Sequence, residues 1–133
     1  MAFTILRIMA GGFMLLFHGL PKLLAYGQIA QSFPDPLGIG SQLSLSLVIF
    51  AEFFCAFLLI TGTGVRFACI PLIITMFVAA FIFHANDPVS KIELPLMYLG
   101  MYVVILIGGA GKYALKFERF TRHHPLLRWG FDV

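Results

Sequence analysis

Residues 43–61, LSLSLVIFAEFFCAFLLIT, form an apolar run that contains one ionisable residue, Glu52. A helix needs ~20 predominantly apolar residues to cross the hydrocarbon core of a bilayer. The run is long and does not keep a period of two along its length, so a helix is favoured over a strand. It therefore predicts a membrane-spanning helix with a carboxyl group near its centre.

Three further apolar runs of similar length accompany this one along the chain. They cover residues 3–24, 67–84 and 94–110. Pro95 stands near the start of the last run, where the first turn of a helix tolerates proline. The fold class predicted for residues 1–111 is therefore all-α, an integral membrane bundle of four transmembrane helices.

The composition of the chain supports lipid as its solvent. Hydrophobic residues make up 60% of the chain and charged residues 11%, whereas a soluble domain is about a quarter charged. The net charge of +3 comes from scattered residues, with no basic reading helix or stacking platform, so nucleic acid is not an expected partner. Cys55 and Cys69 lie inside apolar runs without a CxxC motif, which predicts buried thiols and no metal site.

The distribution of lysine and arginine predicts how the chain is oriented. With a cytoplasmic N-terminus, the outer side holds only Lys22 and Lys91. The inner side then holds the other basic residues: Arg7, Arg66, Lys112, Lys116, Arg119, Arg122 and Arg128. The positive-inside rule predicts that both termini are cytoplasmic, in a multi-pass protein of the bacterial inner membrane. Residues 112–133 form a basic amphipathic tail, expected on the cytoplasmic membrane surface.

Ionisable residues within or next to the spans are candidate functional residues, because burying them in lipid costs a few kcal/mol or more. In the predicted topology most of them gather at the outer end of the bundle. The candidate ligand site consists of His18, Lys22, Glu52, His84, Asp87, Lys91 and Glu93. Each has a plainer interpretation: the lysines can extend to the interface, Asp87 can cap a turn, Glu93 can stabilise the start of the last helix, and both histidines can be satisfied core residues.

Glu52 is the hardest of these residues to explain as ordinary packing. A carboxyl at the middle of the bilayer must be protonated, paired or facing a polar cavity. Arg7 and Arg66 are its candidate buried charge partners. The glycine pair Gly11 and Gly12 is expected to permit close contact between helices.

At this point the sequence resembles the DoxX family of small four-helix membrane proteins. The matching segments are residues 7–8, 18–23, 52, 58–62, 65–66, 84–88, 91–98 and 109–113. The resemblance extends to about Leu115 and implies a link to quinone metabolism and redox-stress complexes. It assigns no catalytic role to these positions. Ala114-Leu115-Lys116 stands where relatives often carry Ser-Leu-Asp, so no function of the tail is carried over.

The function predicted is that of a quinone-linked or redox-associated membrane subunit, with a polar site at the outer end of the bundle. A non-enzymatic scaffold, either a homo-oligomer or an anchor for a partner oxidoreductase, is one alternative. A haem protein with His18 and His84 as axial ligands is another. The chain has no nucleotide fingerprint, flavin motif or nucleophile–base arrangement, so catalytic residues and cofactor stay unassigned.

Overall fold

The computed structural model describes residues 1–111, which contain helices and no strand. Four helical spans within this part are long and apolar enough to cross a membrane. They are Ala2–Leu24, Ser41–Thr61, Val65–Phe83 and Val89–Gly108. The predicted all-α, four-helix architecture is confirmed, whereas the tail predicted at 112–133 lies outside the described residues. The cytoplasmic placement of the termini stays a prediction.

Three of the four spans change helix type along their length, and each contains one short π-helical segment. The first span comprises α1 (Ala2–Met14), η1 (Leu15–Gly19) and α2 (Leu20–Leu24), followed by the short helix α3 (Tyr26–Ile29). The second comprises α4 (Ser41–Ile49), η2 (Phe50–Cys55) and α5 (Ala56–Thr61). The third comprises α6 (Val65–Val78) and η3 (Ala79–Phe83), and the fourth is α7 (Val89–Gly108).

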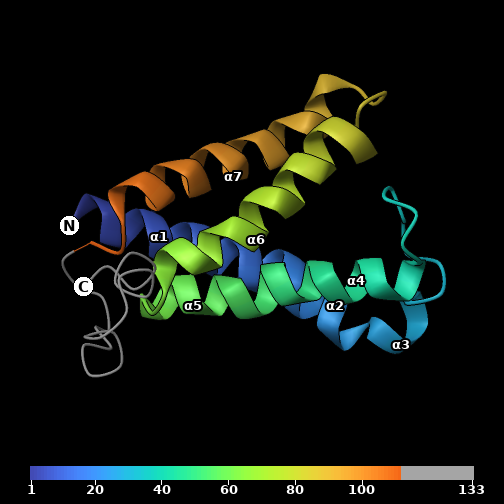
Figure 1. Cartoon of the computed structure of the whole chain (residues 1–133), viewed down its shortest axis with the longest axis horizontal. Coiled ribbons are helices and arrows are strands. Elements are labelled where there is room, and N and C mark those ends of the chain that lie inside the picture. Colours follow the sequence, from blue (N-terminus) through green and yellow to red (C-terminus); the bar gives the residue numbers. More distant parts are fainter. Residues whose placement is uncertain (112–133) are drawn as a thin grey trace.

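The first and second spans form one hairpin, and the third and fourth spans form another. The two hairpins meet at one end and separate at the other (Figure 1). Near the N-terminus α1 packs on α5 and α7, and α6 packs along α7. A tight turn joins α5 to α6, with Gly62 and Gly64 at φ 81° and 58°, a conformation that glycine adopts without steric cost. At the opposite end, here called the cavity end, α4 and α6 diverge (Figure 1).

The inner faces of the spans form a continuous core. Met14, Leu59, Leu72, Tyr102 and Ile105 are fully buried in it. Large apolar side chains also cover the outside of the bundle, including many phenylalanines. In water such a surface would promote aggregation, but in a bilayer it contacts lipid tails. The inside and outside of the bundle are therefore both apolar, as a membrane bundle requires.

Arg7 joins three segments of chain at the N-terminal end of the bundle, and it is 1% exposed. Its Nε donates a hydrogen bond to the carbonyl of Ala110 at 2.8 Å. One terminal nitrogen donates to the carbonyls of Leu59 at 2.5 Å and Ile60 at 2.6 Å. Leu59 and Ile60 lie in the last turn of α5, where a cation is favoured by the helix dipole, and Ala110 lies just beyond the end of α7. Arg7 thus fixes the first span to the second span and to the segment that follows the fourth.

The fourth helix begins earlier than the sequence analysis predicts. We expected a start at 94, but α7 begins at Val89, directly after Pro88, whose φ and ψ are −58° and 150°. A proline at this position lets the next residue open a helix, so the polar residues up to Glu93 are helical. Pro95 therefore lies inside α7, not at its start. The third helix ends at Phe83, so His84 follows the helix.

Candidate ligand site

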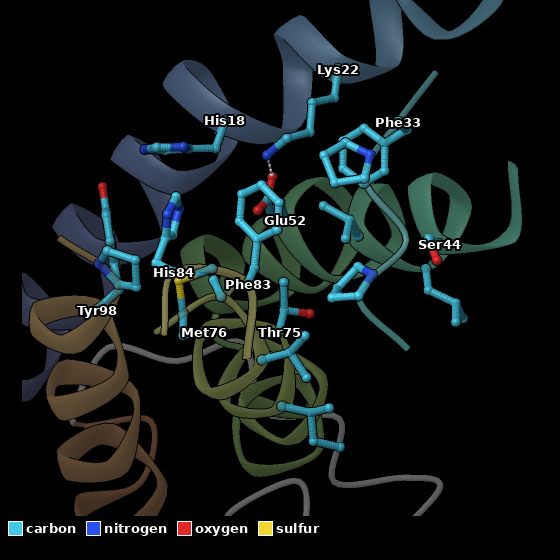
Figure 2. A pocket seen from close by; sticks show the side chains of 18 of the residues that line it. His18, Lys22, Phe33, Ser44, Glu52, Thr75, Met76, Phe83, His84 and Tyr98 are labelled. Carbon is cyan, nitrogen blue, oxygen red and sulfur yellow. Dashed lines mark hydrogen bonds and ion pairs between the residues drawn. The ribbon is translucent and has the colours of Figure 1, made fainter. Parts of the chain in front are cut away.

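A cavity of about 510 Å³ lies at the cavity end, lined by residues of both hairpins. Its walls are mostly apolar, and its size is typical of small-molecule sites. Five of the seven predicted site residues line it: His18, Lys22, Glu52, His84 and Lys91. The spans thus bring together residues that are far apart in the sequence (Figure 2).

Each π-helical segment lies beside this cavity. His18 is part of η1, Glu52 is part of η2, and His84 directly follows η3. The backbone N–H of His84 donates to the carbonyl of Ala79 at 3.0 Å. A π-helical turn widens the helix, and such turns are frequent at functional sites. Pro21 favours η1, because a proline has no N–H to donate to the preceding turn.

Lys22 and Glu52 form an ion pair within the cavity. Figure 2 shows Lys22 reaching from the first span toward the Glu52 carboxylate. Glu52 is 4% exposed, so its carboxylate needs a partner to stay charged in this apolar surrounding. The two arginines predicted as candidate partners bind elsewhere. Arg7 donates to backbone carbonyls, and Arg66 Nε donates to the carbonyl of Leu106 at 3.2 Å.

Gly19 lets η1 and η2 approach closely enough for this pair to form. A Cβ added at Gly19 would overlap the backbone of Glu52 and Phe53. Gly11 has the same role two turns earlier, because a Cβ there would lie 2.9 Å from the carbonyl oxygen of Ala56. Gly12, by contrast, has nothing within 4 Å of such a Cβ. Close contact is therefore confirmed for Gly11 but not for Gly12.

His18 faces an aromatic wall formed by α7. Its ring meets Tyr98 edge-on, with ring centroids 5.7 Å apart, and Tyr98 in turn stacks on Tyr102 at 5.9 Å. Within residues 1–111 the imidazole of His18 has no hydrogen-bond partner, and it lines the cavity together with Tyr98. Tyr98 is not among the residues predicted for the site. Tyrosines spaced four apart in an apolar helix were the available signal, because a buried hydroxyl needs a polar surrounding.

His84, Asp87 and Lys91 form a polar cluster at the mouth of the cavity. His84 Nδ1 donates to Asp87 Oδ2 at 2.7 Å, and Lys91 Nζ lies 3.7 Å from the same oxygen. The hydrogen bond from His84 lowers the pKa of Asp87, and the charge of Lys91 acts in the same direction. Asp87 orients His84 without lining the cavity itself. Glu93 is exposed on α7 and is likewise not part of the lining.

The segment before α4 covers the cavity with apolar side chains. Phe33, Pro34, Pro36, Leu37 and Ile39 all line it, and we call residues 33–39 the cover segment. Asp35 holds this segment to α4, because its carboxylate accepts hydrogen bonds from the Ile39 and Gly40 amides and the Ser44 hydroxyl at 2.7–3.0 Å. The Ser44 hydroxyl lowers the pKa of Asp35 most, followed by the Gly40 amide.

Comparison with known proteins identifies the family of this bundle. The DoxX family model matches residues 2–85. The chain belongs to the DoxX family. The match includes the η1, η2 and η3 segments with His18, Glu52 and His84, and it ends before α7. With this family and four apolar spans, the chain is a multi-pass membrane protein.

One relative of this DoxX protein comes from Haemophilus influenzae (strain ATCC 51907 / DSM 11121 / KW20 / Rd) and is described as an uncharacterized protein. It is 30% identical over 109 residues, covering 78% of this chain and 72% of the relative. No solved structure matches the chain.

Proposed function

We propose that this chain is a quinone-binding, redox-associated protein of the bacterial inner membrane, with both termini in the cytoplasm. The observation that carries the proposal is the cavity between the hairpins. It is mainly apolar and lies among the spans, yet His18, Lys22, Glu52, His84 and Lys91 converge on it. A few polar groups in an apolar pocket are typical of a small-molecule site.

The polar groups of the cavity suit a ligand with carbonyl acceptors. The ammonium of Lys22 carries three N–H donors, and its bond to Glu52 uses one of them. Neither ring nitrogen of His18 has a hydrogen-bond partner within residues 1–111. His84 uses Nδ1 to bind Asp87, which leaves its Nε2 available to a ligand. A quinone ring presents two carbonyl oxygens on opposite edges, which such donors can bind.

The cavity also suits a planar and uncharged ring. Tyr98, Phe33 and Phe83 supply aromatic faces or edges to its wall, and aromatic pairs favour offset or edge-on contact. The charge of Lys22 is matched by Glu52. A phosphate-bearing head group would need unmatched cations, whereas a neutral ring leaves the ion pair intact.

Reduction of a quinone requires two electrons and two protons. Two sets of groups near the cavity can exchange protons. Glu52 is buried inside it, and the His84–Asp87 pair lies at its mouth. Because the sequence carries no flavin or nucleotide motif, electrons would come from a partner oxidoreductase. Anchoring such a partner unites the redox role with the scaffold role.

Equilibrium binding of a short-chain benzoquinone to the detergent-solubilised protein tests the proposal. His18→Ala and His84→Ala should each weaken binding by about tenfold, the equivalent of one hydrogen bond of ~1.4 kcal/mol. Phe17→Ala is the matched control, because Phe17 neighbours His18 in η1 but is 68% exposed and lines no part of the cavity. Unchanged binding in both histidine variants would overturn the site.

The same sample tests the haem alternative, which the placement of both histidines on one cavity favours. Haem is added to the purified protein and its absorption spectrum is recorded. A Soret band that is lost in both histidine variants would replace the quinone proposal with a bis-histidine haem site. A spectrum without such a band removes the alternative.

A further inference from the structure

We propose that the cavity opens to the bilayer between α4 and α6, and that this opening holds the hydrocarbon chain of the bound ligand. The inference rests on the proposed function, since the chain is taken to extend from a ring held by His18, Lys22 and His84. It goes further by assigning a second subsite and a route of entry from lipid.

The lining of the cavity continues onto the lipid-facing surface of two helices. Leu47 and Val48 of α4 line one side, and Ile74 and Val78 of α6 line the other. Leu47 is 51% exposed and Ile74 is 56% exposed. Since both helices cross the membrane, these exposed surfaces face lipid tails. We call these four residues the side opening.

The side opening is apolar throughout its described walls. Thr75 also lines the cavity between Ile74 and Val78, but its hydroxyl donates to the carbonyl of Pro71 at 2.9 Å. Its polar atom is therefore satisfied within α6, which leaves the methyl group for packing. A hydrocarbon chain needs no polar partner here, whereas a head group would find none.

The arrangement of the helices explains why the opening exists. Figure 1 shows α4 and α6 running apart toward the cavity end. The cover segment, residues 33–39, rises from the start of α4 toward the turn before α7 (Figure 1) and lines the cavity from this end. Its apolar side chains cover the cavity there, so the side between α4 and α6 is the route for a lipid-soluble ligand.

A chain-length series tests the inference. The affinities of a benzoquinone without a chain and of analogues with one isoprene unit, two units or a decyl chain are measured for the wild type and for Ile74→Trp. The indole should fill the side opening. We expect Ile74→Trp to weaken binding of the chain-bearing analogues by about tenfold, as excluding roughly two methylenes would, and to leave the bare ring unaffected.

Phe77→Trp is the control, because Phe77 is also on α6 and 51% exposed but does not line the cavity. Leu47→Trp, on the opposite wall, is the second test variant and replaces Ile74→Trp if that protein does not elute as a single species. Comparing variants at one detergent concentration cancels partition of the analogues into micelles.

The outcomes separate this inference from the proposed function. If the bare ring binds and the chain-length dependence is equal in the wild type, Ile74→Trp and Leu47→Trp, the side opening alone is overturned. A bare ring and chain-bearing analogues that all fail to bind the wild type overturn the proposed function and this inference with it. Selective loss of the chain contribution in the side-opening variants supports the inference.

Discussion

Lys22 of α2 and Glu52 of η2 form an ion pair across two transmembrane spans, although 30 residues separate them in the sequence. Glu52 is buried, and the Lys22 side chain is 25% exposed. The pair joins the first and second spans at the level of the cavity. It also explains how a carboxylate is kept in the middle of an apolar span.

Removing either member of this pair should destabilise the bundle. Glu52→Gln or Lys22→Met leaves one uncompensated charge in an apolar surrounding, and we expect each to lower the free energy of unfolding by about 3 kcal/mol. The double variant should lose clearly less than the sum of the two. Unfolding in mixed micelles with increasing denaturing detergent measures all three; strictly additive losses would show that the two side chains are not coupled.

A methyl group at Gly19 should force the first two spans apart. Gly19→Ala places a Cβ against the backbone of Glu52 and Phe53, and overpacking of this kind costs about 1–3 kcal/mol. The quinone affinity should fall as well, because the ion pair depends on this approach. Gly12→Ala is the control on the same span; it meets nothing and should change stability by no more than about 1 kcal/mol.

The same unfolding assay and quinone titration apply to both glycine variants. If Gly19→Ala is as stable as Gly12→Ala and binds quinone equally well, the close packing of η1 on η2 is incorrect.

Arg7→Lys should destabilise the N-terminal end even though the positive charge is retained. A lysine has a single nitrogen and cannot span the carbonyls of Leu59, Ile60 and Ala110 that the guanidinium bridges. We expect a loss of about 2 kcal/mol or more, since hydrogen bonds to charged groups contribute roughly 1.5–3 kcal/mol each. Unfolding in micelles measures the loss. Wild-type stability in Arg7→Lys would show that charge alone suffices.

The cover segment should loosen only in acid. Hydrogen bonds from Ser44 and the Gly40 amide lower the pKa of Asp35, so Asp35 stabilises the fold above its unfolded pKa of about 3.9. That contribution is lost as the pH falls through the lowered, folded-state pKa. The amide resonances of Ile39 and Gly40 should therefore shift with a pH midpoint clearly below the value of about 3.9 that an unfolded aspartate has.

Asp35→Ala should abolish this transition, whereas Asp87→Asn should leave it unchanged because Asp87 lies at the other side of the cavity mouth. In the wild type, a pH midpoint near the ordinary pKa of an aspartate would contradict the role of Asp35 in holding the cover segment to α4.

The number and type of the spans could be predicted because hydrophobicity over ~20 residues dominates a membrane fold. Position within a span was harder. The start of α7 was misplaced because Ser90, Lys91 and Glu93 made its first turns look like a loop, and Pro95 looked like a first-turn residue. Pro88 was the better signal for the start of this helix.

The site could be predicted as a set of residue types but not as a set of contacts. Glu52 was identified as needing a partner, yet that partner depends on how two helices pack and not on spacing along either one. Gly19 decides this packing and carries no chemical signal of its own. Among the π-helical segments, η1 has a local signal in Pro21, and Tyr98 could be recognised only from its spacing of four residues to Tyr102.

Photoaffinity labelling with an azido-substituted quinone tests the central claim most directly, since it shows where the ring lies. The intact protein is labelled in micelles with and without excess unlabelled quinone, and the modified residues are identified by mass spectrometry. We predict competed labelling at cavity residues around His18, Glu52, His84 and Tyr98. Labelling that resists competition and spreads over lipid-facing side chains such as Phe13 and Phe57 would contradict a quinone site in this cavity.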